Sequence, residues 1–400
     1  MITSLFVDGF KSLVNFSITF EKGLNVLVGV NGVGKTNICQ SMRILASMPT
    51  NKLKNVLNEL GGAGCIFTKN DLCKAGSRKK EFIIKMGGEC TFDDPMTKEK
   101  YELTYDYELS VLLRRTGNLR INEILNVNRK NGEGTYVPLL KVQNEKKKLK
   151  YSVLNKDLLG DMKLTQEKFS LDIDDEDTLW WLLPKISIVC SVIAKDIHRI
   201  KSINIDPFIA RQACDVMEPH LMLGNGKYLA NALHKLNASQ LDEINSLLES
   251  SLPCCFKVKP EISNLSLQRY FTLVDEKKNK FSSNSLSDGT VKLLGLLVGV
   301  INQEEYTMII EEMENYLHPT VNSLLIQYLR ETFNSGVCIL TTHSETILNL
   351  IRPEELIICR SSDNLTSCHR ISNMDAINEA INRTGFGCGY HYVKGNLSSL

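Results

Sequence analysis

The spacing of hydrophobic residues predicts β-structure in the first part of the chain. Residues 2–20 alternate apolar and polar side chains in two pieces broken at Asp8-Gly9, which indicates a hairpin. From residue 81 to about residue 142 the period is again two, as expected for an antiparallel sheet with one solvated face. Residues 144–177 are charged and weakly patterned, so we interpret them as an exposed insertion.

The pattern becomes helical further along the chain. Apolar residues recur at helical spacing in residues 186–197, 229–236 and 241–248, and residues 257–274 return to a strand pattern. In residues 285–359 the order is loop, helix, strand, helix, strand, helix, strand. This order is typical of a parallel sheet wound with helices, so the chain is expected to be an α/β protein.

One stretch between a strand pattern and a helix pattern carries a phosphate-binding motif. The eight residues from Gly29 to Thr36 fit G-x-x-x-x-G-K-[ST] at every fixed position, between an apolar run at 25–28 and a helical run at 38–47. Glycines let successive backbone N–H groups approach an anion. We therefore expect Lys35 to reach the β- and γ-phosphates of a nucleotide and Thr36 to hold Mg²⁺, and we favour this over a simple Gly-rich turn.

Acidic residues follow a second predicted strand. The hydrophobic run 306–310 ends in Glu311-Glu312, at the edge of the sheet where α/β proteins bind ligands. Glu311 is expected in the Mg²⁺ shell, and Glu312 is placed to take a proton from the attacking water. A further strand, residues 337–340, runs towards His343, whose imidazole could contact the γ-phosphate. The two halves must then meet in one sheet.

Length and charge limit the remaining possibilities. A chain of 400 residues is too long for one compact core, so two domains or a large insertion are expected. A net charge of +1 gives no global attraction to nucleic acid. The basic runs at residues 78–80 and 146–148 are local, and we interpret them as solvated loop faces rather than as a polyanion site.

The twelve cysteines are scattered and form no C-x-x-C pair, and no basic-then-apolar leader begins the sequence, so a reducing cytoplasm is expected. Cys368, His369, Cys388 and His391 could supply zinc ligands, although we favour ordinary buried thiols. The longest apolar run, residues 293–301, is half the length of a membrane span and predicts a buried helix rather than a membrane segment.

These motifs together resemble the ABC-type ATPases of the RecF, SMC and OLD group, and especially the stand-alone AAA-labelled ATPases of bacterial antiphage systems. Besides Gly29–Thr36, the matching segments are Leu286-Ser287-Asp288-Gly289-Thr290, similar to the ABC signature, residues 310–319, similar to the Walker B and D-loop segment, and Thr342-His343-Ser344. Upstream of the signature, Asp206-Pro207 with Arg211, and Asn225-Gly226 leading to Leu229-Ala230, also look like family positions. Met313 stands where the family usually has proline, and no Q-loop glutamine can be assigned.

The resemblance implies a P-loop ABC-type ATPase head with an antiparallel β lobe and a helical/β insertion, without coiled-coil arms because no long heptad run occurs. It implies ATP and Mg²⁺ as cofactors and a head-to-tail homodimer in which Ser287 and Gly289 contact the ATP of a second copy. Catalysis would fall to Glu312 and His343, and the metal to Thr36 and Glu311. The residues expected to bind the nucleotide are Gly29, Asn31, Gly32, Gly34, Lys35, Thr36, Asn37, Ser287 and Gly289.

The expected organisation has four parts: residues 1–60 carry the phosphate loop, 61–200 form a β-rich and charged insertion, 201–360 complete the head, and 361–400 form a tail. Two functions remain open. The chain is either an ATPase switch that controls a separately encoded nuclease or toxin in antiphage defence, or a stand-alone RecF-like ATPase of DNA repair. With either function, the protein could bind DNA or RNA directly. A transporter subunit is disfavoured because the signature lacks the transporter-type glycine pair.

Overall fold

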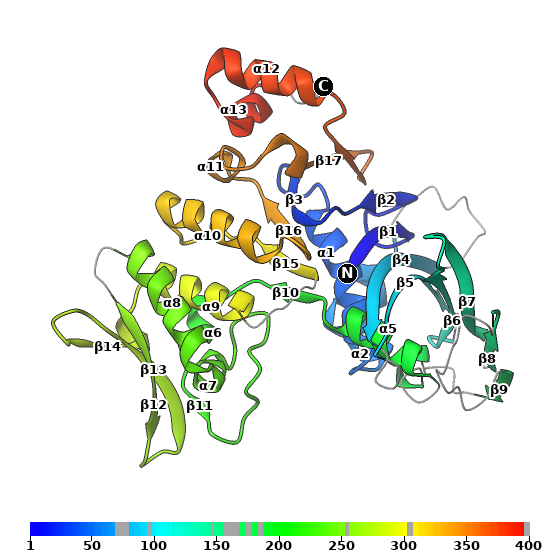
Figure 1. Cartoon of the computed structure of the whole chain (residues 1–400), viewed down its shortest axis with the longest axis horizontal. Coiled ribbons are helices and arrows are strands. Elements are labelled where there is room, and N and C mark those ends of the chain that lie inside the picture. The colour runs from blue at the N-terminus through cyan, green and yellow to red at the C-terminus, as the bar shows by residue number, and fades with distance from the viewer. Residues whose placement is uncertain are drawn as a thin grey trace. The chain divides into compact units, whose positions relative to one another are not determined.

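The computed structural model describes residues 1–68, 80–93, 98–114, 116–145, 148–155, 168–172, 178–182, 187–252, 256–301 and 307–395. The chain divides into two compact units (Figure 1). Unit 1 comprises residues 1–21, 29–200 and 358–369, and unit 2 comprises residues 22–28, 201–357 and 370–400. The chain therefore passes from unit 2 into unit 1 directly before the phosphate loop.

Unit 1 contains an antiparallel sheet of eight strands in the order β2-β1-β4-β5-β6-β7-β8-β9. The strands are β1 Ile2–Asp8, β2 Phe16–Thr19, β4 Lys80–Asp93, β5 Lys100–Leu113, β6 Leu119–Lys130, β7 Tyr136–Glu145, β8 Lys148–Val153 and β9 Lys168–Asp172. Both the predicted hairpin and the predicted antiparallel sheet are confirmed. Its described helices are α1 Lys35–Ser47, α2 Leu53–Glu59, α3 Ala63–Ile66, the 3-10 turn Leu179–Trp181 and α5 Ile188–His198.

The expectation of an exposed insertion from residue 144 is wrong where β8 lies. Leu149 and Tyr151 are 0% and 1% exposed, because alternate residues of this strand face the core of the sheet. Charged lysines between them dominate the local composition and hide a short period-two pattern. Of the acidic run at residues 172–177, only Asp172 lies within the described residues.

A buried carboxylate holds the segment around Trp180 to this sheet. Glu123 on β6 is 1% exposed and accepts hydrogen bonds from Tyr107 Oη (2.6 Å), Asn144 Nδ2 (2.9 Å) and the Leu179 backbone N–H (2.9 Å). The Trp180 indole N–H donates to the same Tyr107 oxygen at 3.1 Å. Burial raises the pKa of Glu123 to about 7, although its three hydrogen-bond donors favour the carboxylate and oppose that rise.

Unit 2 is built around four parallel strands in the order β10-β15-β16-β3. These are β10 Lys201–Ile203, β15 Thr307–Glu311, β16 Val337–Thr342 and β3 Gly23–Val28. β15 and β16 are fully buried along their length, as expected for strands covered by helices on both faces. The strand before the phosphate loop thus shares a sheet with the strands of both later motifs, which confirms that sequence prediction.

Helices and a smaller antiparallel sheet complete unit 2. The helices are α6 Pro207–Ala210, α7 Leu229–Lys235, α8 Ala238–Ser251, α9 Asp288–Ile301, α10 Pro319–Thr332, α11 Glu345–Leu348, α12 Met374–Thr384 and α13 Cys388–Val393. The sheet consists of β11 Cys214–Asp215, β12 Lys257–Ser263, β13 Gln268–Val274 and β14 Lys280–Ser282. The remaining strands are β17 Leu356–Ser362 and β18 Leu365–Arg370. Among the described helices, none is long and apolar enough to cross a membrane.

The Glu123 site predicts a pH-dependent stability of unit 1. An unfolded glutamate ionises near 4.5, so the folded chain holds the proton more tightly and its stability falls as pH rises from about 5 through 7. The full effect is about 3 kcal/mol, at about 1.4 kcal/mol per pKa unit. The non-titrating variant Glu123→Gln should lack this component.

The two tryptophans of the sequence, Trp180 and Trp181, directly follow Leu179, whose N–H this carboxylate holds, so their fluorescence reports urea unfolding of this region. Comparing the wild type with Glu123→Gln at pH 5 and pH 8 measures the effect. Parallel pH dependences in the two proteins would contradict the prediction.

Candidate nucleotide-binding site

The phosphate loop in unit 1 has a backbone that requires glycine. Gly34, directly before α1, has a φ of 103°, in the left-handed region that other residues avoid. A Cβ at this position would also overlap Thr366 Oγ1, which donates to the Val33 carbonyl at 2.8 Å. Glycine is therefore needed here both for the turn and for the close approach of β18.

The loop surrounds the Lys35 ammonium. Lys35 is 8% exposed, and its Nζ donates to the carbonyl oxygens of Gly29 (2.6 Å) and Val30 (3.2 Å). Thr36, in the first turn of α1, is exposed, as are Asn31 and Gly32. The loop thus combines the buried ammonium of Lys35, the exposed hydroxyl of Thr36 and the exposed backbone of Gly32, which suits binding of a phosphate chain.

A cavity of about 430 Å³ in unit 1 was not predicted from the sequence. It is lined by Lys11, Ser12, Cys65, Phe67, Thr68, Asn364 and Leu365. Ser12 joins it to the phosphate loop, because its Oγ accepts from Asn37 Nδ2 at 2.8 Å and lies 2.6 Å from Thr366 Oγ1. Lys11 Nζ donates to Gln40 Oε1 on α1, and burial lowers the pKa of Lys11. The lining residues come from distant parts of the chain, so no local pattern could reveal them.

In unit 2 the parallel register gathers the predicted acidic residues at one edge. Glu311 lies opposite Thr341, and Thr342 lies opposite Val28, the last residue before the phosphate loop. Glu311 is 5% exposed at the end of β15. Glu312 follows with a φ of 47°, and its carboxylate accepts from Asn315 Nδ2 at 2.8 Å.

A third carboxylate, which sequence reasoning did not select, connects this edge to the predicted histidine. Glu314 Oε1 accepts from Thr342 Oγ1 at 2.6 Å and from the His343 backbone N–H at 3.3 Å, and lies 3.8 Å from His343 Nδ1. The side chain of His343 is 42% exposed and that of Glu314 is 9% exposed. Glu314 therefore fixes the turn that presents the imidazole. The only sequence signal was its place two residues after Glu312.

The signature-like segment begins helix α9. Ser287 is exposed, and its Oγ accepts from the Thr290 N–H at 3.1 Å, as an N-cap does. A side chain at Gly289 would overlap the carbonyl oxygen of Tyr316, so this glycine allows the helix to lie against the loop that follows Glu312. Ser287 and Gly289 thus belong to the same packed region of unit 2 as Glu312.

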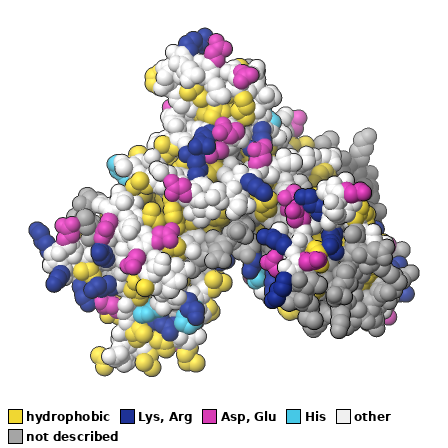
Figure 2. All heavy atoms as spheres, in the orientation of Figure 1, with side chains coloured by type: hydrophobic (Ala, Val, Ile, Leu, Met, Phe, Trp, Pro, Cys, Tyr) yellow, Lys and Arg dark blue, Asp and Glu magenta, His cyan; other side chains and the backbone are white. Residues whose placement is uncertain are grey.

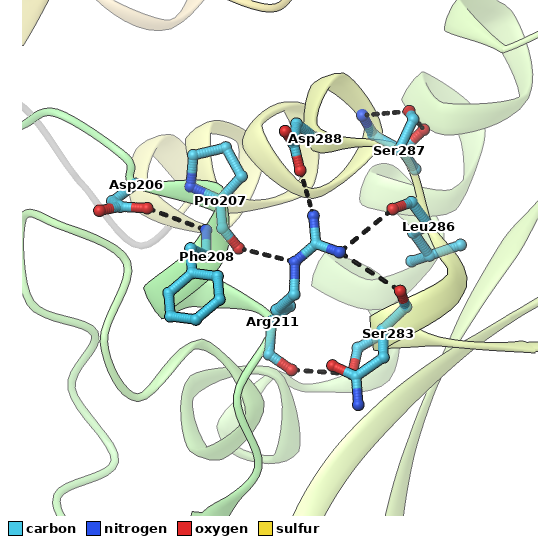
Figure 3. A network of polar contacts seen from close by, with 10 residues as sticks. Asp206, Pro207, Phe208, Arg211, Ser283, Leu286, Ser287 and Asp288 are labelled. Carbon is cyan, nitrogen blue, oxygen red and sulfur yellow. Dashed lines mark hydrogen bonds and ion pairs between the residues drawn. The ribbon is translucent and has the colours of Figure 1, made fainter.

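Arg211 also contacts the signature segment (Figure 3). Its guanidinium donates to the carbonyl oxygens of Pro207 (3.1 Å), Asn284 (3.4 Å) and Leu286 (3.4 Å) and pairs with the Asp288 carboxylate. One planar cation therefore links α6 and the segment before α9 to the Asp288 carboxylate at the first residue of α9.

The alternative zinc site is not supported. Within the described parts of the chain, no group of three or more His, Cys, Asp or Glu side chains is arranged to hold a metal ion. Cys368 Sγ instead lies 2.8 Å from Cys359 Sγ, and Cys388 is buried. The interpretation of these cysteines as ordinary thiols fits this arrangement.

Comparisons with known proteins agree with these features. The family model described as "AAA domain, putative AbiEii toxin, Type IV TA system" matches residues 24–349. The "DNA replication and repair protein RecF" of Thermoanaerobacter sp. (strain X514) and that of Thermoanaerobacter pseudethanolicus (strain ATCC 33223 / 39E) are each 34% identical over 87 residues. This match covers 21% of the chain and only 24% of each relative.

A solved SMC head, bound to the C-winged helix domain of ScpA, has a similar fold, with a TM-score of 0.52 and 12% identity over 94% of this chain and 99% of that one. The family match spans most of the sequence and includes both the phosphate loop and the acidic edge. The chain therefore belongs to this AAA-domain family of ATPases, and its fold is similar to that of the SMC head.

Proposed function

We propose that this ATPase is a switch subunit whose nucleotide state controls a separately encoded nuclease or toxin in bacterial antiphage defence. The observation that carries the catalytic part is the parallel register: Glu311 and Thr342 lie at one sheet edge, and Thr342 pairs with Val28, after which the phosphate loop begins. This edge is where ligands of α/β proteins bind.

The assigned roles follow from the chemistry of each group. Lys35 would bind the β- and γ-phosphates, together with the backbone of Gly29, Asn31, Gly32 and Gly34, and Asn37 would support the loop. The Thr36 hydroxyl and the buried Glu311 carboxylate offer the oxygen ligands that Mg²⁺ prefers. Bound Mg²⁺ would neutralise charge on the phosphates. Glu312 would accept the proton of the attacking water, and His343 would donate to the γ-phosphate.

The cavity next to the loop is the proposed place for the nucleoside. Its lining combines the Phe67 ring with the polar groups of Lys11, Ser12, Thr68 and Asn364, which suits an aromatic base and a ribose. Ser12 connects it to Asn37 on α1, so the cavity is next to the start of the helix that carries Lys35 and Thr36.

Assembly is the second part of the proposal. Ser287 and the Gly289 backbone are exposed or half-buried at the start of α9, where they could contact the γ-phosphate held by Lys35 of a second copy. A γ-phosphate shared by donors of two subunits favours the closed dimer more than ADP can, so hydrolysis would shift the conformational population.

The effector is inferred from the family, whose description names a toxin and a Type IV TA system. The RecF relatives favour the alternative, a DNA-binding ATPase of repair. Charge gives that alternative little support: net charge is +1, and described side chains of opposite sign are interspersed on the face in Figure 2. In this proposal residues 1–60 and 201–360 form the head, 61–200 an accessory lobe and 361–400 a tail.

The first test is nucleotide binding. Lys35→Ala should weaken binding of a non-hydrolysable ATP analogue by about 100-fold, because charge-assisted hydrogen bonds to phosphate contribute roughly 1.5–3 kcal/mol each. Isothermal titration measures the affinity, with Lys52→Ala, an exposed lysine beyond the same helix, as the matched control. Equal affinities of Lys35→Ala and Lys52→Ala would disprove the assignment of the loop.

The second test concerns hydrolysis and closure together. Glu312→Gln keeps the shape of the side chain but loses the base. It should therefore still bind ATP, release phosphate at least about 100-fold more slowly than wild type, and accumulate as a closed dimer. Adding Ser287→Arg places bulk and charge at the shared phosphate and should prevent closure.

The readout is the distance between spin labels placed near Lys35 of one subunit and Ser287 of the other, with and without ATP. Mass alone does not suffice, since subunits can associate through other surfaces. A distance that stays constant in Glu312→Gln, or that shortens equally with Ser287→Arg, rules out the shared site.

The third test concerns the effector. The purified chain should not cleave plasmid DNA with ATP and Mg²⁺ or Mn²⁺, because in this proposal a separately encoded partner carries the nuclease or toxin activity; among the described residues, no group of three or more His, Cys, Asp or Glu side chains is arranged as a metal site. Co-expression with its neighbouring genes should restrict phage growth, and Lys35→Ala should abolish that protection. Cleavage by the chain alone that survives Lys35→Ala would overturn the separate-effector model.

A further inference from the structure

Helix α9 carries a buried lysine among apolar residues. Lys292 is 1% exposed, and the residues around it on the helix, from Val291 to Val300, are buried valine, leucine and glycine. Removing an ammonium from water is strongly unfavourable unless its charge and its N–H groups are matched by partners. A leucine or methionine would fill the same space without that cost, so the cation needs an explanation other than packing.

Within the described parts of the chain, the contacts of the Lys292 ammonium lie in the loop after β15. Its Nζ donates to the backbone carbonyl of Glu312 at 2.8 Å and lies 5.8 Å from the centre of the Tyr316 ring. Burial lowers the pKa of Lys292 to about 8, and the nearby carboxylates of Glu314 and Glu312 oppose that shift. The signature helix is thus tied by one charged side chain to the loop that carries the proposed base.

Glu312 occupies a backbone conformation that needs such support. Its φ of 47° lies in the left-handed region, which is unfavourable for a residue other than glycine. Its N–H donates to the Thr341 carbonyl at 3.0 Å, and its carbonyl accepts from Lys292. Both peptide groups that flank the Cα are therefore held, one by β16 and one by α9, and this fixes the direction in which the carboxylate leaves the backbone.

We propose that Lys292 is a positioning residue for ATP hydrolysis, which holds the Glu312 backbone so that its carboxylate faces the attacking water. This inference rests on the proposed role of Glu312 as the base. Lys292 itself touches neither nucleotide nor water in this proposal. The start of the same helix, at Gly289, lies against the Tyr316 carbonyl, so α9 contacts the base-carrying loop at two points.

The decisive variant is Lys292→Met in the full-length protein. Methionine fills the volume and removes the buried charge, so stability should be unchanged or higher while the Glu312 carbonyl loses its donor. We expect kcat to fall at least 10-fold, with the affinity for a non-hydrolysable ATP analogue within about twofold of wild type. Lys292→Gln, whose amide can still donate to the carbonyl, should recover part of the rate.

Leu296→Ala is the matched control, since Leu296 is equally buried on the same helix. It should lower the melting temperature and leave kcat nearly unchanged. A double-mutant cycle then tests whether Lys292 acts through Glu312. In the Glu312→Gln background, Lys292→Met should cause no further loss in single-turnover hydrolysis, because the carboxylate that Lys292 positions is already absent.

The outcomes separate the inference from the function on which it rests. Wild-type turnover in Lys292→Met and Lys292→Gln, with Glu312→Gln inactive, overturns the positioning role and leaves the base assignment intact. Wild-type turnover in Glu312→Gln overturns the base assignment itself. Two results would contradict the inference and assign Lys292 a general structural role. One is an equal rate loss from Lys292→Met in the wild-type and Glu312→Gln backgrounds. The other is a rate loss accompanied by the same fall in melting temperature as in Leu296→Ala. If Lys292→Met does not fold, the same comparisons are made with Lys292→Gln.

Discussion

The register of three parallel strands determines which residues meet at the sheet edge where we propose that ATP is hydrolysed. β15, β16 and β3 pair so that Glu311 stands opposite Thr341, and Thr342 stands opposite Val28. Backbone hydrogen bonds set these neighbours, and a slip of one residue would turn every side chain to the other face of the sheet. Glu311, the Thr342–His343 turn and the end of β3 are therefore placed by the ladder before any side-chain contact forms.

Much of this arrangement could be predicted from the sequence, because its signals are local. A strand, a Gly-rich loop and a helix follow one another within residues 23–47, and the acidic pair directly follows its own strand. Chain direction alone then brings the ends of parallel strands to one edge. The period-two pattern predicted the sheet of unit 1 for the same reason, since successive residues of a strand point to opposite faces.

The residues that support the site could not be predicted in this way. Thr366 reaches the Val33 carbonyl across 333 positions of sequence. Arg211 was noted as a family position, but its partner Asp288, 77 positions away, was not predicted. Their partners are backbone carbonyls or single charges, which leave no periodic trace. Glu314 was hidden for another reason, because a third acid beside Glu311 and Glu312 looks like ordinary surface charge until Thr342 and His343 are seen to donate to it.

Buried polar groups mark the places where this fold gives up stability for geometry. The buried carboxylate of Glu123 accepts hydrogen bonds from three donors in distant segments of unit 1. The ammonium of Lys292 instead donates to one loop of unit 2. That loop, between β15 and α10, also contains two residues other than glycine with positive φ, Glu312 and Tyr316. Such a conformation costs stability in a residue other than glycine, so it persists only where surrounding contacts hold it. At Glu312 the buried ammonium of Lys292 supplies one of these contacts, and the hydrogen bond to the Glu312 carbonyl helps to fix the direction in which the carboxylate leaves the loop.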